Sequence, residues 1–178
     1  MVLPPGLIMT SATAAVPYQA HPLLRRILIT WPVVGGLDAL YVTVVFGFIR
    51  ATATPMRLWQ GVARALLDKA AFDGGALTAL LGLAMHFCVA LGWTVVWALV
   101  YDRSPVVQSL VARPLHAVLA GLAYGVFIWL AMNRVILPLV TYIKPAPLAT
   151  LNSYLVLLSH LTVIGPPIVL LMRDRAPR

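Results

Sequence analysis

The chain contains four long segments in which nearly every residue is hydrophobic, separated by shorter stretches that hold most of its charges. The segments cover residues 27–49, 76–100, 114–132 and 149–172. Each has about 19 to 25 residues, which at about 1.5 Å per residue is long enough for an α-helix to cross a hydrocarbon core of roughly 30 Å. None shows the alternation of polar and apolar residues that a membrane β-strand requires. The pattern therefore predicts four membrane-spanning helices.

A shorter segment between the first two, residues 56–70, has a different pattern. Its apolar side chains recur on one face of a helix, namely Leu58, Trp59, Val62, Leu66 and Ala70. The opposite face is polar and carries Arg57, Gln60, Arg64 and Asp68. This amphipathic pattern predicts a helix that lies in the membrane interface, with Trp59 and Leu66 toward the lipid. A plain connector with no function of its own is the alternative.

These patterns together predict an all-α fold, an integral membrane four-helix bundle with an additional interfacial amphipathic helix. Residues 1–22 are rich in Pro, Ala and small polar residues and lack the charged start of a signal peptide, so we expect a disordered or extended tail. Residues 23–175 then form a single four-span membrane domain.

Composition supports a membrane protein and excludes one class of partner. The chain is 61% hydrophobic and 10% charged, with a mean hydropathy of +0.93, whereas a soluble domain has about 25% charged residues. The net charge of +8 could indicate nucleic-acid binding in a soluble protein. Here the basic residues lie at the ends of the apolar segments, where they meet lipid headgroups. We therefore expect a lipid bilayer and no nucleic acid as partner. A slight excess of basic residues on the side of the termini favours cytoplasmic termini.

Each apolar segment carries one polar or ionisable residue about 10 or 11 positions after its start. These residues are Asp38, His86, Tyr124 and His160. All four fall near the bilayer midplane, where ionisable groups are costly and face the bundle interior, so the sequence predicts a shared polar cluster. The cluster could be a hydrogen-bond network that only fixes packing, or a relay for protons or ions. Two histidines at one depth, His86 and His160, could also bind a haem or another metal, although no spacing motif supports a metal and we predict no cofactor.

Three further polar residues, Asn133, Arg134 and Asp73, form a secondary set. Asn133 and Arg134 follow the third apolar segment. The Arg134 side chain either extends to the headgroups or reaches Asp73, the acidic residue on the same side of the membrane. Neither alternative implies a catalytic role.

Small residues and prolines interrupt the spans near the polar positions. Gly35 and Gly36 precede Asp38, and Gly165-Pro166-Pro167 follows His160. Broken helices of this kind occur at transporter binding sites, and simple close packing is the alternative. Gly121 and Gly125 form a G-x-x-x-G pair, which predicts packing against another span or another copy of the chain.

Three stretches carry a resemblance: AAFDGGALTALLGLAMHF at 70–87, AGLAYGVFIWLAMNRVILPL at 120–139 and LLSHLTVIGPPI at 157–168. With the first span they make residues 26–172 resemble a family of uncharacterised four-span bacterial inner-membrane proteins. The chain differs from that pattern at Arg134, where an apolar residue is expected. The resemblance implies a bacterial inner-membrane location and brings no activity, cofactor or catalytic residue.

No enzyme motif is present, so we expect a protein that is not an enzyme. The sequence has no G-x-S-x-G, no H-E-x-x-H and no phosphate-binding loop. We expect either a small transport or permeation unit, or an accessory subunit of a larger membrane complex that contacts a membrane-protein partner or a second copy. A haem-binding redox protein and a purely structural scaffold are the alternatives.

Overall fold

The computed structural model describes residues 22–141 and 147–174, and this part of the chain is helical. Four helices are long and apolar enough to cross a membrane: Leu23–Ile49, Gly75–Arg103, Pro114–Val140 and Leu151–Met172. The predicted all-α four-span bundle is therefore confirmed. The predicted tail, residues 1–22, lies almost entirely outside the described residues.

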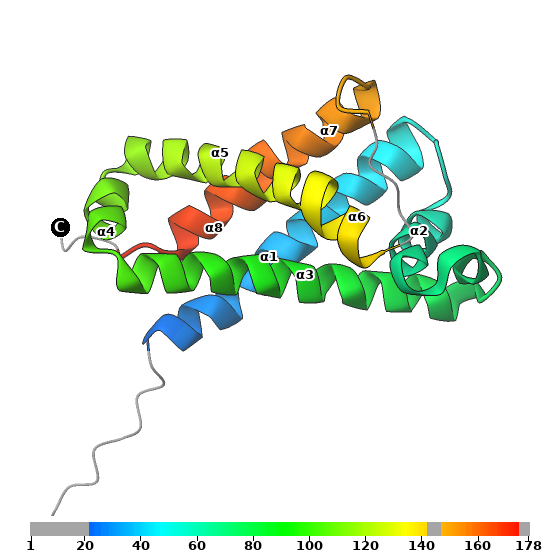
Figure 1. The fold of residues 1–178 in the computed structure, drawn as a ribbon, viewed down its shortest axis with the longest axis horizontal. Helices are drawn as coiled ribbons and strands as arrows, with labels where there is room; N and C mark the ends of the chain where they lie inside the picture. The colour runs from blue at the N-terminus through cyan, green and yellow to red at the C-terminus, as the bar shows by residue number, and fades with distance from the viewer. Residues whose placement is uncertain (1–21, 142–146, 175–178) are drawn as a thin grey trace, which may run out of the picture.

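The spans are not uniform α-helices. The first contains α1 (Pro22–Val42) and a π-helical segment, η1 (Thr43–Ile49), and the second is α3 (Gly75–Arg103). The third runs through α5 (Pro114–Leu130), a π-helical η3 (Ala131–Ile136) and α6 (Leu137–Val140). The fourth runs through α7 (Leu151–Ser159), a π-helical η4 (His160–Ile164) and α8 (Gly165–Met172). In Figure 1, α3 and α5 follow the length of the molecule, while α1 and α8 run obliquely to them.

The third span is longer than the sequence analysis predicts. The pattern ends this span at residue 132, but the helix continues to Val140. Pro138 lies just inside α6 and cannot donate a backbone hydrogen bond. A local π adjustment such as η3 is one way in which a membrane helix tolerates a proline, so the span passes Pro138 without ending.

The short connection between the second and third spans is also helical, which the sequence analysis does not predict. Helix α4 covers Pro105–Ala112. The Ser104 hydroxyl accepts a hydrogen bond from the Val107 backbone N–H at 3.2 Å, and Pro105 occupies the first turn. A capping serine followed by proline is a typical helix start.

The additional amphipathic helix is present as α2 (Pro55–Leu67), followed by the 3₁₀ segment η2 (Asp68–Phe72). Leu66, which is predicted to face lipid, is 61% exposed. Gln60, from the predicted polar face, is instead buried and only 1% exposed. The reason is close packing on α3, where a Cβ on Gly82 would come within 1.8 Å of the Trp59 carbonyl oxygen. The buried Gln60 amide donates to the Gly75 carbonyl at 2.9 Å, which explains how a polar side chain is accommodated there.

The third and fourth spans approach each other through glycine. A Cβ on Gly125 would come within 2.2 Å of the His160 carbonyl oxygen, and one on Gly121 within 2.4 Å of Pro166 Cα. Gly165 faces them in the same way, because its Cβ would lie 2.1 Å from the Gly121 carbonyl oxygen. The G-x-x-x-G pair is therefore occupied by the chain's own fourth span.

A polar cluster joins the start of the first span to the end of the fourth. The Arg26 guanidinium forms an ion pair with the Asp174 carboxylate and donates to the Met172 carbonyl at 3.1 Å. The Tyr101 hydroxyl donates to Asp174 Oδ2 at 3.0 Å. The hydrogen bond from Arg26 holds the pKa of Asp174 below its ordinary value. The first and last spans thus begin and end on the same side of the bundle.

Candidate functional site

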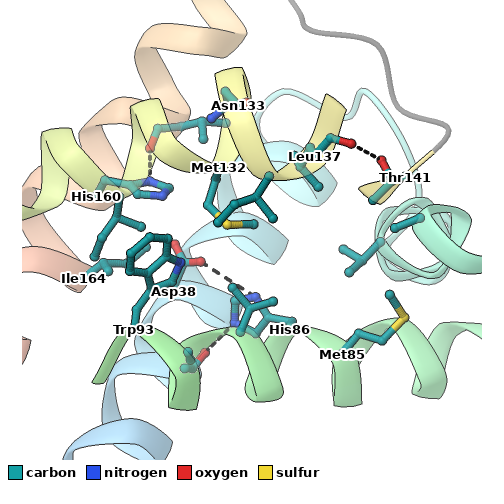
Figure 2. Close-up of a pocket in the computed structure, with 18 of the residues that line it drawn as sticks. Asp38, Met85, His86, Trp93, Met132, Asn133, Leu137, Thr141, His160 and Ile164 are labelled. Atoms are coloured by element: carbon teal, nitrogen blue, oxygen red, sulfur yellow. Dashed lines mark hydrogen bonds and ion pairs between the residues drawn. The ribbon is translucent and has the colours of Figure 1, made fainter. Parts of the chain in front are cut away.

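A cavity of about 550 Å³ lies within the bundle, and all four spans and α2 contribute to its wall. Most of the lining is aliphatic. The polar side chains among the lining residues include Asp38 from α1, His86 from α3, Asn133 from η3 and His160 from η4. Figure 2 shows these side chains arranged around one end of the space, with Met85 and Leu137 farther along it. Three of the four residues of the predicted midplane cluster therefore line one cavity.

Asp38 and His86 face each other across a gap. The His86 Nδ1 atom lies 3.9 Å from Asp38 Oδ2 (Figure 2). This distance is too long for a direct hydrogen bond and suits a bridge through one small donor such as water. The second carboxylate oxygen, Asp38 Oδ1, is buried and has no hydrogen-bond partner among the described residues. Asp38 is 8% exposed, so this carboxyl group is almost fully enclosed while its hydrogen-bonding capacity is unused.

The backbone contacts of the two histidines determine which ring nitrogens carry protons. His86 Nε2 lies 3.0 Å from the Gly35 carbonyl oxygen, and His160 Nδ1 lies 2.8 Å from the Val156 carbonyl oxygen. A carbonyl oxygen only accepts, so each of these nitrogens must be the donor. In the neutral rings the remaining nitrogens, His86 Nδ1 and His160 Nε2, are therefore acceptors.

This assignment makes the polar end of the cavity rich in acceptors. The Oδ2 atom of Asp38 and one ring nitrogen from each histidine have lone pairs there, while the N–H groups of the neutral rings point to backbone carbonyls. An ionised Asp38 opposite a neutral His86 would place two lone pairs against each other. A proton on one of the pair, or a donor between them, is needed to remove that repulsion.

Tyr124 lies outside this group. Its hydroxyl donates to the Trp93 carbonyl at 2.7 Å, and its ring packs against Trp97 and Phe127. It does not line the cavity. Tyr124 instead ties the third span to the second, behind the wall that Trp93 forms, which gives it a packing role.

The secondary polar residues occupy different places. Asn133 lines the cavity and donates to the Trp129 carbonyl of its own helix at 2.8 Å. Arg134 is exposed on η3, and Asp73 is exposed after η2. No ion pair joins Arg134 to Asp73 within residues 22–141 and 147–174, and neither residue lines the cavity.

Each of the two histidines has one ring nitrogen that could serve as a metal ligand. In haem proteins the axial histidine binds iron through one nitrogen and donates from the other, often to a backbone carbonyl, and both rings meet the second condition. The available nitrogen of His86, however, faces Asp38. In the described part of the chain, no three of the His, Cys, Asp and Glu side chains are grouped to hold a metal ion. Haem binding stays an untested alternative to the prediction of no cofactor, and a visible spectrum of the purified protein tests it.

The sequence analysis does not identify most of the cavity wall. Trp93, Val89 and Met85 lie on α3 with His86, and Ile136, Leu137 and Val140 extend the wall along the third span. The last three lie beyond residue 132, where the sequence analysis ends the third span. The only sequence signal for this region is the run of apolar residues around Pro138.

A second hollow, of about 370 Å³, adjoins the cavity between α2 and α6 and shares Ala65, Leu66, Val140 and Thr141 with it. The other end of the lining lies at Ile164 and Ile168, where α8 begins. The cavity thus has one end near α2 and α6 and a more enclosed end near α8.

The fold and this cavity define a four-span α-helical membrane protein with an internal polar site. Comparison of the chain with protein-family models, with curated proteins and with solved structures finds no match.

Proposed function

We propose that this chain is a small transport or permeation unit of the bacterial inner membrane, with cytoplasmic termini, and that the cavity is its binding site. The observation that carries the proposal is the cavity of about 550 Å³ that contains Asp38, His86 and His160. A protein that only needed polar contacts to fix its helices would pair these groups directly. Here Asp38 Oδ1 has no hydrogen-bond partner in the described chain, and Asp38 Oδ2 lies 3.9 Å from His86 Nδ1, too far for a direct hydrogen bond.

Cavity size and helix geometry support this function. Small-molecule sites have volumes of about 300–1,000 Å³, and the cavity falls within this range. The π-helical segments η3 and η4 carry Asn133 and His160 into its wall. π-Helical turns are frequent at functional sites, and interrupted helices near the middle of a span are typical of transporter sites.

Transport requires that the cavity be reached from both sides of the membrane. Cysteine variants at its two ends test this, in a background in which the single cysteine is removed by Cys88→Ala. Ala65→Cys reports the end near α2 and α6, and Ile168→Cys reports the end near α8, where Ile168 is fully buried. The reagent is a membrane-impermeant thiol compound, added to one side of vesicles at a time.

We expect Ala65→Cys to react from one side and Ile168→Cys to react, more slowly, from the other. Val96→Cys is the matched control, because Val96 is 40% exposed on the outer surface of α3 and lies within a span. It should not react from either side. If Ile168→Cys reacts from neither side while Ala65→Cys reacts, the site is a binding pocket and not a transport pathway.

An accessory subunit is the second candidate, supported by one surface feature. Ala84, Cys88 and Gly92 form an exposed line of small residues on α3, and a Cβ on Gly92 would meet nothing within 4 Å. Helices pack closely across such lines in membranes. Oxidative cross-linking of the native Cys88 tests a contact between two copies. A cross-linked dimer from dilute vesicles supports it, whereas a protein that stays monomeric contradicts a homo-oligomer through this face.

A further inference from the structure

We propose that the cavity binds a small organic cation, an amine with an apolar body and N–H donors, in exchange for the proton held between Asp38 and His86. This inference rests on the proposed function, because it names the class of ligand for the same cavity. It depends on the balance of donors and acceptors at the polar end and on the apolar character of the rest of the wall.

The donor and acceptor balance favours a ligand that brings donors over one that brings only acceptors. Asp38, His86 and His160 present lone pairs to the cavity, because the N–H of each neutral ring already binds a backbone carbonyl. Asn133 also directs an amide N–H to its own helix. A primary ammonium group carries three donors and no acceptor, as a lysine head does. It could bind Asp38 Oδ2 and fill the gap of 3.9 Å to His86 Nδ1.

The ionisable groups packed around Asp38 allow this exchange of charge. On its own span, the Tyr41 hydroxyl donates to the Leu155 carbonyl. From α3 and η4 the facing groups are His86 and His160. The other ionisable side chains nearby are engaged elsewhere, since Tyr124 of α5 donates to the Trp93 carbonyl and Arg64 of α2 pairs with Asp68 at 3.7 Å.

The exchange conserves charge in the cavity. In the empty protein one proton resides on Asp38 or His86 and relieves the repulsion between their lone pairs. When the ammonium group binds, that proton passes to water and the ammonium supplies the positive charge in its place. No covalent bond forms or breaks in the ligand. Burying a carboxylate costs less free energy when a cation is bound to it than when it is isolated. The ammonium therefore takes the place of the proton, and the net charge of the cavity does not change.

The remaining lining fits an apolar body. Met85, Val89, Ile136 and Leu137 provide aliphatic surface beyond the polar end, and Trp93 provides an aromatic ring beside it. A cation within about 6 Å of an indole ring gains a further electrostatic attraction. The ligand class is therefore an arylalkyl or alkyl amine and not a bare inorganic ion.

Titration calorimetry of the full chain in lipid nanodiscs tests this inference with three related probes. Phenylbutylamine has charge and donors, trimethyl(phenylbutyl)ammonium has charge without donors, and phenylbutanol has neither charge nor an N–H group. We expect the amine to bind at least tenfold more tightly than the other two. Repeating the titration in buffers of different ionisation enthalpy should show release of about one proton, and the affinity should then rise as the pH rises.

Asp38→Asn should abolish both the preference for the amine and the proton release, while Asp73→Asn, at an exposed carboxylate outside the cavity, should change neither. Proton release is also measured with the unmodified chain, so this test does not depend on whether Asp38→Asn folds. If phenylbutanol binds as tightly as the amine and no proton is released, the cavity stands and the ligand class is wrong. If no probe binds, the cavity is not a small-molecule site and the proposed function fails with it.

Discussion

Replacing Gly125 by alanine links the packing of the bundle directly to the site. Gly125 lies in the middle of α5, and a Cβ there would meet the His160 carbonyl oxygen at 2.2 Å and the His160 carbonyl carbon at 2.8 Å. Both atoms are backbone, so no side chain can rotate away. The third and fourth spans must separate locally, and the displaced residue is His160 of the cavity wall.

The size of the effect follows from two opposing terms. Extra atoms forced into a packed interior cost about 1–3 kcal/mol, and sometimes more. Alanine is favoured over glycine within a helix by about 0.5–1 kcal/mol. Because the clash involves the backbone of a neighbouring span, we expect the first term to prevail and the free energy of unfolding to fall by about 1–2 kcal/mol.

Gly92→Ala is the matched control. Gly92 is also in the middle of a span, but a Cβ there would meet nothing within 4 Å. Only the helix term applies, so its free energy of unfolding should stay equal or rise by up to about 1 kcal/mol. Reversible unfolding in mixed micelles, followed by circular dichroism, measures both variants. If Gly125→Ala is as stable as Gly92→Ala, the close contact between the third and fourth spans is refuted.

Three other variants probe separate contacts. Tyr124→Phe removes the hydrogen bond to the Trp93 carbonyl and should cost up to about 1 kcal/mol in the same unfolding assay, while leaving amine binding unchanged; a loss of binding would place Tyr124 in the site. Gln60→Leu leaves the Gly75 carbonyl without its partner and should cost about 1–3 kcal/mol, which an unchanged unfolding curve would contradict. Asp174 has a folded pKa below its ordinary 3.8, chiefly through the hydrogen bond from Arg26. The contribution of this carboxylate to the free energy of unfolding is under about 1 kcal/mol, because the side chain is 67% exposed. The contribution is present above the ordinary pKa and is lost as the pH falls through the folded pKa. Asp174→Asn should therefore match the wild type only at the acid end of a pH series.

The sequence predicts the spans well because their signal is simple. A run of about 20 apolar residues is required for crossing, and each of the four runs coincides with a helix. The end of the third span is missed because the polar residues Asn133 and Arg134 resemble the end of an apolar segment. In the structure both lie within a π-helical turn at Ala131–Ile136, and the helix continues through Pro138 to Val140. Sequence alone does not distinguish polar residues that end a span from polar residues that lie within one.

Depth along a span is readable from the sequence, but direction around the helix is not. The four residues of the predicted midplane cluster have equivalent positions along their spans. Only Asp38, His86 and His160 line the cavity, and Tyr124 does not. The first and fourth spans are so uniformly apolar that their own pattern does not reveal which face is inside. Gln60 shows the same limit for α2, where close contact at Gly82 buries a residue that amphipathicity places outside.

The proposed function requires that Asp38 lie in a cavity open to water and not in a dry or lipid-facing position. Reaction of two cysteine variants with a water-soluble thiol reagent tests it, in the Cys88→Ala background. Asp38→Cys replaces a cavity residue, whereas Leu40→Cys, two residues along the same helix, replaces one that is 62% exposed on the outer surface. Asp38→Cys should react many times faster than Leu40→Cys, and Val34→Cys, one turn earlier in the cavity wall, should do the same. Equal, negligible rates for all three variants would contradict it.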